Sequence, residues 1–517
     1  MELKVIYFCF LLLVLANVPI KCNFKAGKRN VLIVMVDDLR YLTEKDIKLR
    51  NIQNLAAKGT NFKNAYAQQA LCGPSRNSIL TGRRPDSLRL YDFYSYWRDT
   101  VGNFTTLPQY FKENGYDTYS VGKIFHPGKC SNFSDDYPYS WSVEPYHPPT
   151  DKFKDAAVCF NPQTKKLESD LICPVKVWEQ PRGSLPDLQC LKYTINFLQR
   201  RNNSDKPFLL AVGFHKPHIP LKYPQHYLHQ VPLRKVRQPK FPYKPKGLPL
   251  VAWHPWTDLR RRQDIERLNI SFPFGIMPSK WTFKIKQSYY AAAKYIDDLV
   301  GELLRHVDMK NTIVVLTSDH GWSLGENGLW AKYSNFNVAV KVPLIFSMPG
   351  FQPKSVSTAA ELVDIFPTLV ELAGISHNIP KCLKNYKSTL CFEGESLVPL
   401  MQPSNKHIDR YAISQYPRPS EYPKKNSDKP ILKDINIMGY SIKTNRYRYT
   451  EWISFNNTIF TKDWNRKYGI ELYDHDLDPF EARNLFKSPK YKIVMSKLSE
   501  LLRSKVEGTD MLKIQAF

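Results

Sequence analysis

The chain lacks a second long apolar run. Residues Val5 to Ala16 are uninterruptedly apolar and follow Lys4, but after about Cys22 no segment approaches the twenty or so apolar residues of a membrane-spanning helix. A short apolar run between a basic residue and a polar turn is typical of a secretory signal peptide. We therefore predict a signal peptide over residues 1–22, no membrane anchor, and a lysosomal or secreted protein of the secretory pathway. Asn-x-Ser/Thr sequons agree with that route: Asn103, Asn132, Asn202, Asn269 and Asn456.

Acidic residues are few. The chain has 48 Asp and Glu against 74 Lys and Arg, and the resulting formal net charge of +26 is spread along the sequence. Such a charge favours an anionic polymer as partner, and nucleic acid is the usual one. Because a signal peptide removes most nucleic acid from reach, we expect no nucleic-acid partner and favour sulfated glycans or anionic surfaces. A basic secreted surface without a particular partner is the alternative.

Cysteine is also scarce in the predicted mature chain. Seven cysteines follow the signal region, and setting aside Cys72, which stands in a different context, leaves an even six. The pairs Cys159/Cys173 and Cys382/Cys391 each close a short loop, which an oxidising compartment favours. Cys130 with Cys190 is the remaining pair.

No internal repeat or low-complexity tract is present, and 517 residues suit one large domain and a smaller one. Buried apolar runs rich in β-branched residues alternate with helical patterns, which predicts an α/β fold. The segment from about Leu221 to Lys280 is typical of long excursions over the sheet. From about Met401 the pattern changes to Tyr-rich alternating strands, followed by a helix from about Lys490 to Val506. We predict a large N-terminal domain over residues 23–400 and a smaller C-terminal α+β subdomain over 401–517.

Three predicted strands end in ionisable groups. Residues 30–36 precede Asp37 and Asp38, residues 207–213 precede His215, Lys216 and His218, and residues 312–317 precede Asp319 and His320. Ligands of open α/β sheets bind at the carboxyl ends of strands. We therefore expect these groups to converge on one crevice.

The carboxylates in this set predict a hard divalent cation. Asp37, Asp38 and Asp319 supply the oxygen ligands that Ca²⁺ or Mg²⁺ require, and His320 adds an imidazole, which is less usual for calcium. Adjacent carboxylates at a buried strand end would repel without a cation. The alternatives are a helix N-cap with a solvated neighbour for the Asp37 pair, and a strand-end turn for Asp319 and His320.

Cationic side chains recur at predicted loop positions: Arg76, Lys123, His126, His218 and Lys332. Singly, each is more often an ordinary surface or turn residue. Together with a metal they would neutralise an anion with several oxygens, and the two histidines would supply an acid and a base near neutral pH. The predicted substrate is an anion of tetrahedral sulfur or phosphorus.

The pentapeptide Cys72-Gly73-Pro74-Ser75-Arg76 is the segment that most nearly indicates a function. The residues that follow, 77 to 85, are typical of a helix with a glycine stop and a basic last turn. Taken alone, the pentapeptide is more simply interpreted as a buried cysteine at a helix start. The predicted metal and cation groups favour instead a cysteine that is the precursor of a modified residue.

With these motifs, the chain resembles the sulfatases of the alkaline-phosphatase superfamily from about Asn30 to Asn484. The pentapeptide looks like their modification signature, in which an enzyme of the endoplasmic reticulum oxidises the cysteine to formylglycine. The segment between Pro349 and Glu361 is shorter than the family pattern, and the tail after Asn484 is unmatched. Further matching motifs occupy residues 81–86, 90–93, 213–220, 317–322, 414–419 and 426–430.

The resemblance implies an alkaline-phosphatase-like mixed central sheet flanked by helices, with the catalytic site in the N-terminal domain. It implies a sulfuric ester hydrolase, closest to those that cleave the 2-O-sulfate of iduronate in heparan sulfate and dermatan sulfate. A formylglycine-generating enzyme would modify position 72 during maturation. One Ca²⁺ ion would be held by Asp37, Asp38, residue 72, Asp319 and His320.

Roles for the cationic residues also follow from the resemblance. A hydroxyl of the hydrated formylglycine would attack the sulfur, Lys123 and Lys332 would share the developing charge, and Arg76 would hold the modified side chain. His218 would protonate the departing sugar oxygen, and His126 would deprotonate the second hydroxyl so that sulfate leaves. The predicted substrate-binding residues are Tyr91, Trp322, Tyr333 and Lys429.

Alternatives remain open at this point. Trp322 and Tyr333 are nearly as well explained by packing. The chain would otherwise be a sulfatase of another glycan specificity, a related phosphodiesterase, or a secreted glycosaminoglycan-binding protein that has lost catalysis. The cysteine motif opposes the phosphodiesterase, and the complete set of site residues opposes the non-catalytic protein.

Overall fold

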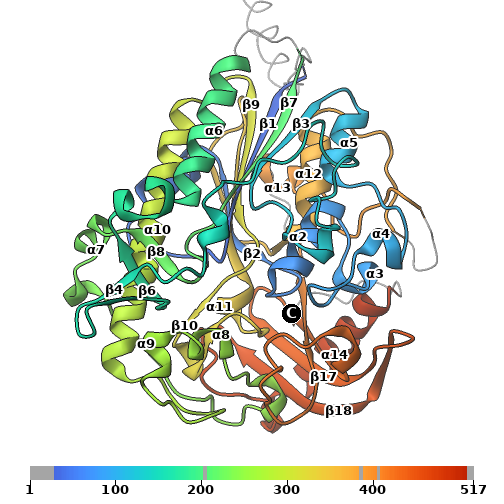
Figure 1. Ribbon diagram of the computed structural model, residues 1–517. Coiled ribbons are helices and arrows are strands. Elements are labelled where there is room, and N and C mark those ends of the chain that lie inside the picture. Colours follow the sequence, from blue (N-terminus) through green and yellow to red (C-terminus); the bar gives the residue numbers. More distant parts are fainter. Residues whose placement is uncertain (1–27, 202–205, 383–387, 404–407, 509–517) are drawn as a thin grey trace, which may run out of the picture.

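The computed structural model describes residues 28–201, 206–382, 388–403 and 408–508 (Figure 1). The predicted signal peptide and the sequon at Asn202 lie outside the described residues. Within them, no helix combines the length and the apolar character needed to cross a bilayer. Figure 1 shows a large α/β body with a smaller, orange-to-red sheet beneath it.

An eight-stranded mixed sheet forms the centre of the α/β body, in the order β13-β2-β12-β9-β1-β7-β3, with β14 also paired to β2. The three strands expected from composition are present, and β1 runs parallel to both β7 and β9. Antiparallel β12 makes the sheet mixed. The strands are β1 (Asn30–Val36), β2 (Thr60–Tyr66), β3 (Asp117–Gly122), β7 (Phe208–Phe214), β9 (Thr312–Ser318), β12 (Lys341–Ser347), β13 (Lys354–Val356) and β14 (Ala360–Glu361).

Helices cover both faces of this sheet (Figure 1). Along β1, Leu32 and Val34 pack into the core beneath the first set of helices, and Val31 and Ile33 pack into the core beneath the second. A strand between two helical layers has no solvated face, which explains its unbroken apolar sequence. The first set is α1 (Arg50–Lys58), α6 (Pro186–Arg201) and α10 (Ser279–Arg305), and the second is α2 (Cys72–Thr81), α5 (Leu107–Glu113) and α12 (Ile365–Leu372).

Shorter elements connect and border the main layers. The predicted excursions between Leu221 and Lys280 consist mostly of loops and one-turn helices. The short helices are α3 (Pro85–Leu88), α4 (Trp97–Thr100), α7 (His226–Gln230), α8 (Thr257–Arg260), α9 (Gln263–Glu266), α11 (Asn337–Val340) and α13 (Val398–Met401). The paired short strands are β4 (Cys159–Asn161) with β5 (Lys166–Glu168), β6 (Ile172–Val175) with β8 (Leu221–Pro224), and β10 (Ser323–Leu324) with β11 (Trp330–Ala331).

A second, antiparallel sheet lies entirely beyond Met401. Its strands are β15 (Ala412–Arg418), β16 (Ile437–Lys443), β17 (Tyr447–Asn456) and β18 (Thr461–Asp474), and α14 (Lys492–Glu507) packs on it. This arrangement agrees with the predicted α+β character, while a domain boundary at residue 400 stays a prediction. The sheet is tied to the body because Gln415 N donates to Gln68 O at 2.7 Å and Ser414 Oγ to Ala67 O at 2.7 Å.

The cysteine pairing was predicted correctly for the local loops only. Cys159 is bonded to Cys173 and Cys382 to Cys391. The pairing of Cys130 with Cys190 was wrong, because both are buried and free. A Cβ on Gly73 of α2 would lie 3.4 Å from Cys130 Sγ, whereas Cys190 belongs to α6. Because α2 and α6 cover opposite faces of the sheet, the sheet separates the two thiols.

Candidate active site

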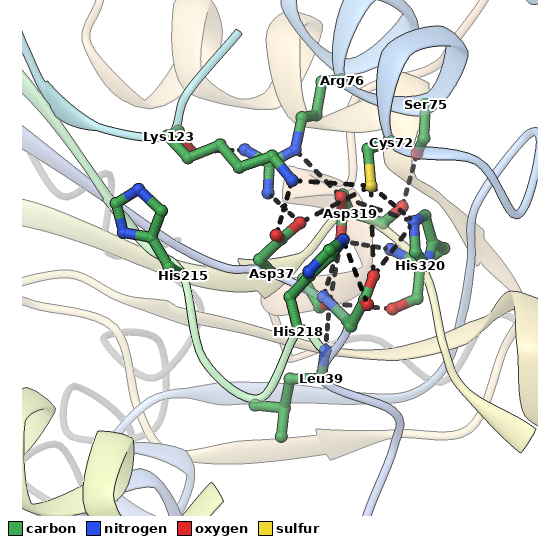
Figure 2. Close-up of polar contacts among 12 residues, drawn as sticks. Asp37, Leu39, Cys72, Ser75, Arg76, Lys123, His215, His218, Asp319 and His320 are labelled. Carbon is green, nitrogen blue, oxygen red and sulfur yellow. Dashed lines mark hydrogen bonds and ion pairs between the residues drawn. The ribbon is translucent and has the colours of Figure 1, made fainter. Parts of the chain in front are cut away.

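The three central strands end at the same level, and this places the candidate site. In the sheet register, Val36 of β1 pairs with both Phe214 of β7 and Ser318 of β9. The residues that follow therefore emerge together at one edge, and Figure 2 shows Asp37, His218, Asp319 and His320 pointing toward one another, with His215 apart from them. The predicted convergence of the three strand ends is confirmed for Asp37, Asp38, His218, Asp319 and His320. His215 and Lys216 line the same cavity but have other partners, since His215 pairs with Asp187 and Lys216 Nζ donates to the Pro220 backbone oxygen.

Cys72 begins α2 and points into this cluster. The helix was expected near residue 77 but starts five residues earlier, since Pro74 fits a first turn whose N–H groups have no partner within the helix. It ends at the predicted Gly82, with φ of 65°, but the predicted basic last turn was wrong, because Arg83 and Arg84 follow the helix. Cys72 Sγ lies 3.0 Å from Lys332 Nζ and 3.3 Å from His320 Nε2. Burial alone would raise the pKa of the thiol, but Lys123 and Lys332 lower it.

Arg76, one helical turn later, orients two of the carboxylates. Its Nε donates to Asp319 Oδ2 at 2.9 Å and its Nη2 to Asp37 Oδ1 at 2.9 Å. Its Nη1 donates to the backbone oxygen of Ile124 at 3.0 Å. Because the guanidinium is fully buried, these charge-assisted bonds fix the ends of β1 and β9 relative to α2.

The carboxylates fit a divalent cation. Asp38 Oδ2 is buried and has no hydrogen-bond partner within the described residues. Burial raises the pKa of Asp38 to about 7, with neighbouring Asp37 adding to the rise against the opposing effect of Lys332. A bound cation would offset both the desolvation of Asp38 and its repulsion by Asp37. Carboxylate oxygens are the ligands that hard divalent ions take. Two overlapping groups have ligand atoms within 4.8 Å of one another: Asp37, Asp38, Cys72 and His218, and Asp38, Cys72, Asp319 and His320.

His320 presents a ligand atom to the same place. Its Nδ1 lies 3.0 Å from the backbone oxygen of Gly321, which assigns the proton of the neutral ring to Nδ1. The Nε2 lone pair then faces Asp38 Oδ1 at 3.5 Å and Asp319 Oδ2 at 3.5 Å. An unprotonated nitrogen among carboxylates is stable when a metal ion lies between them.

Two lysines flank Cys72. Lys123 Nζ lies 2.5 Å from Asp37 Oδ2, and Lys332 Nζ lies 2.8 Å from Asp38 Oδ1. Lys123 is placed by a close backbone approach, since a Cβ on Gly213 would lie 1.9 Å from the Lys123 backbone oxygen. Lys332 lies between two residues with positive φ, Ala331 at 65° and Tyr333 at 70°, which turn the chain sharply at this point.

The two histidines predicted as acid and base border a cavity of about 160 Å³ with Asp37 and Lys123. His218 Nε2 lies 3.8 Å from Asp38 Oδ2, while its Nδ1 lies 2.6 Å from the Ile219 backbone oxygen. His126 stacks on Phe93 with ring centroids 4.3 Å apart. Burial and nearby lysines lower the pKa of both histidines well below its usual value.

Three of the four predicted substrate residues lie beside Lys332. Its Nζ is 5.6 Å from the centre of the Trp322 ring. Tyr333, the next residue, donates its hydroxyl to Asp258. Lys429 Nζ lies 2.8 Å from Asp258 Oδ1, so one acidic residue joins Tyr333 and Lys429.

Tyr91 lies elsewhere, at the junction with the C-terminal sheet, and its substrate-binding role stays a prediction. Its ring is 2% exposed and packs against Phe455 and Phe460, with centroids 5.4 and 6.4 Å away. This packing joins the segment after α3 to the C-terminal sheet. Its ring contacts are therefore with the C-terminal sheet and not with Lys332 or Asp258.

Sequence reasoning missed residues that support the site. Tyr289 of α10 donates its hydroxyl to the Asp38 backbone oxygen at 2.7 Å, where Asp38 has φ of 62°. Asp187, in the first turn of α6, accepts from His215 N at 2.6 Å and so fixes the loop after β7. No motif marks Tyr289, whereas an acidic residue in a first helical turn is a recognisable signal for Asp187.

Comparison with known proteins agrees with this site. The family model described as Sulfatase matches residues 29–375, and that described as N-sulphoglucosamine sulphohydrolase, C-terminal, matches 325–507. The chain belongs to the sulfatase family. It is a sulfuric ester hydrolase, which decides against the non-catalytic alternative. Sulfatases in general carry a metal ion and a formylglycine, and the buried acidic, Cys and His cluster of this sulfatase is where both would lie.

Individual relatives cover nearly the whole of this sulfatase. It is 46% identical over 510 residues to Iduronate 2-sulfatase of Homo sapiens, covering 90% of this chain and 92% of that one. It is 26% identical to Arylsulfatase K of Bos taurus, and the match covers 92% of this chain and 81% of that one.

Solved structures of related proteins bear out the alkaline-phosphatase-like fold. The phosphonate monoester hydrolase of Agrobacterium radiobacter superposes with a TM-score of 0.67 at 18% identity, covering 93% of this chain and 96% of that one. A structure described as a 2-O GAG sulfatase superposes with a TM-score of 0.59 at 21% identity, with 95% of each chain covered.

Proposed function

We propose that this sulfatase removes the 2-O-sulfate from iduronate in heparan sulfate and dermatan sulfate, as a lysosomal or secreted enzyme. The similarity that carries the proposal is the 46% identity to Iduronate 2-sulfatase, which extends over 90% of the chain. The buried ring of carboxylates, lysines and histidines around Cys72 supports it, because these groups suit an anion with several oxygens.

Position 72 and the metal would supply the nucleophile and the electrophilic assistance. Cys72 Sγ stands where the oxygens of a hydrated formylglycine would lie after modification by a formylglycine-generating enzyme. A formylglycine hydrate supplies a nucleophilic hydroxyl, and Ca²⁺ polarises sulfate oxygens. The residues that would hold the ion are Asp37, Asp38, residue 72, Asp319 and His320.

The lysines would stabilise negative charge on the reacting sulfate. Lys123 Nζ lies 3.7 Å from Cys72 Sγ and Lys332 Nζ lies 3.0 Å from it, so both ammonium groups are next to the reacting position. They are buried, and a buried charge acts more strongly on a nearby oxyanion than a solvated one does. Arg76 would contribute by fixing Asp37 and Asp319.

The histidines would move protons on either side of the sulfur. His218, whose Nε2 faces Asp38, would give a proton to the departing sugar oxygen, because the negative charge of a bound sulfate would offset the burial and the lysines that lower its pKa. His126 would take a proton from position 72, since its buried Nδ1 has no partner within the described residues. The sugar ring would lie against Trp322 and Tyr333, with the iduronate carboxylate on Lys429, whose side chain is 37% exposed.

Two measurements test this function. Mass spectrometry of the peptide that contains position 72, from material secreted by a host able to make formylglycine, should show the aldehyde or its hydrate. Unmodified cysteine in that material would contradict the mechanism. A disaccharide with 2-sulfated iduronate should be hydrolysed faster than one with 6-sulfated glucosamine, and equal or reversed rates would reject the proposed specificity.

A further inference from the structure

The cavity beside the reacting centre extends well beyond it. At one end it is lined by Asp37, Lys123 and His218, and at the other by the turn around Thr150 and by residues of α6 and β8. The residues proposed to hold the iduronate, Trp322, Tyr333 and Lys429, do not line this cavity. The far end is therefore space that the reacting sugar does not account for.

Most of the lysines in this cavity are already engaged. Lys123 is paired with Asp37. Lys216 Nζ donates to the Pro220 backbone oxygen at 2.7 Å. Lys222 Nζ donates to the Phe153 backbone oxygen at 2.9 Å. Each of these ammonium groups has a structural task within the protein.

Lys154 differs from them. It lines the cavity, yet within the described residues its ammonium group forms no hydrogen bond or ion pair. Lys154 is exposed at the edge of the cavity, where partial desolvation and nearby Lys123 lower the pKa of its ammonium group, and Lys154 in turn contributes to the low pKa of His218. The Lys154 charge is therefore close to the other cations of the site and would be stabilised by an anion brought into the cavity.

The turn that carries Lys154 is held in place from two directions. Lys222 Nζ donates to the Lys154 backbone oxygen at 3.1 Å in addition to that of Phe153. Thr150 Oγ1 donates to Gln189 Oε1 of α6 at 2.8 Å. The backbone position of Lys154 is thus set before any ligand binds, which reduces the entropy that binding costs.

We propose that Lys154 binds a second sulfate of the substrate, carried by the sugar next to the iduronate, an inference that rests on the proposed function. The reacting sulfate is served by Lys123 and Lys332, and the iduronate carboxylate by Lys429. The far end of the cavity, beyond His218, is where the adjoining sugar would lie. Lys154 would then favour chains in which that sugar is sulfated.

Matched substrates test this role. One is 2-sulfated iduronate joined to a 6-O-sulfated glucosamine, and the other is the same disaccharide without the 6-O-sulfate. Lys154→Gln should raise KM for the first by about tenfold, the range expected for losing a hydrogen bond to a charged group, and KM for the second by less than twofold. Lys152→Gln is the control, because Lys152 lies on the same turn but does not line the cavity, and its Nζ lies 5.3 Å from the Phe153 ring.

The possible failures are distinguishable. If the unaltered enzyme hydrolyses neither disaccharide, the proposed function fails and the Lys154 role fails with it. If the enzyme is active but Lys154→Gln changes KM equally for both disaccharides, or for neither, only the Lys154 role is rejected. An equal rise would assign Lys154 to a group of the iduronate itself. A Tm equal to that of the unaltered enzyme shows that the variant is folded.

Discussion

At the residue scale, the site consists of charges that are almost all matched by a neighbour. Arg76 and Lys123 share Asp37, and Lys332 binds Asp38, so the groups nearest to Cys72 Sγ are held by one another. Cys72 itself is 1% exposed, and the charged groups that its sulfur contacts, Lys332 at 3.0 Å among them, keep their other partners. The ion pairs around position 72 therefore do not depend on its side chain, whereas the proposed catalysis does.

Cys72→Ala follows from that contrast. We expect turnover to fall below detection, because alanine leaves no precursor for the nucleophile, while Tm falls by only a few degrees, as for a small buried truncation. Activity and thermal unfolding are measured on the same preparations. Cys190→Ala is the matched control, since Cys190 is also buried and free but lies on α6, and it should keep its activity. Turnover by Cys72→Ala would rule out covalent catalysis at this position.

Sequence predicted the charged groups of the site but not the residues that place them. Asp37 and Asp319 were recognisable because each follows an apolar run that reads as a strand. Tyr289 and Lys154 were not, since α10 and the turn after Thr150 reach the site only through tertiary packing. Nor did the sequence predict that Tyr91 packs against Phe455 of the C-terminal sheet.

At the element scale, the site depends on the close fit of neighbouring strand ends. β3 and β7 pair up to Gly122 and Gly213, and Lys123 N then donates to the Gly213 backbone oxygen at 3.1 Å. The sequence predicted β7 to within one residue at each end, because both faces are buried and the strand is continuously apolar. The glycine contact was not predictable, because it requires the register between β3 and β7.

Gly213→Ala is expected to displace Lys123. The added Cβ would lie 1.9 Å from the Lys123 backbone oxygen, so the backbone must shift and carry the ammonium group away from Asp37. We expect a loss of about 10²-fold in kcat, as for a misplacement of about 1 Å in a catalytic group, together with a lower Tm. Steady-state kinetics and thermal unfolding measure these effects.

The control is Gly183→Ala, at a surface turn with φ of 59° where a Cβ meets nothing within 4 Å. Gly183→Ala should lower the free energy of unfolding by about 1 kcal/mol, because alanine is strained in the left-handed conformation, and it should leave kcat unchanged. A normal kcat in Gly213→Ala would show that Lys123 does not depend on this contact.

At the scale of the whole molecule, a buried carboxylate of the C-terminal part, Glu481, joins it to the body. Glu481 accepts from Arg448 Nε at 2.6 Å, from His475 Nε2 at 2.9 Å and, across the junction, from Asn337 N at 2.9 Å. Composition predicted a change of architecture near residue 401. It did not predict this junction, because Asn337 and Glu481 are 144 residues apart in sequence. Burial opposes ionisation of Glu481, yet Arg448 and His475 lower its pKa to about 2.

Glu481→Gln tests the junction and its pH dependence. A carboxyl whose folded pKa is lowered from 4.5 to about 2 stabilises the fold fully above pH 4.5 and loses that contribution as the pH falls toward 2. We expect the variant to be less stable by about 3 kcal/mol at pH 7, because Arg448 is left buried without one of its partners. Thermal unfolding at pH 7, 4.5 and 3 should show the difference in Tm narrowing at the lowest pH.

The control for this experiment is Glu500→Gln on the exposed face of α14, which should leave Tm within a degree or so at each pH. A constant difference in Tm between the Glu481 variant and the unaltered enzyme from pH 7 to pH 3 would contradict ionisation of Glu481 as its source.

The burial of α2 also bears on the order of events in the life of the protein. Every residue from Cys72 to Thr81 is buried, and Cys72 Sγ lies among the paired lysines and carboxylates. An enzyme that oxidises this cysteine cannot reach it once the sheet and its helices have assembled. The proposed modification would therefore have to precede folding, and a chain that folded with its thiol intact would remain inactive until it unfolded again.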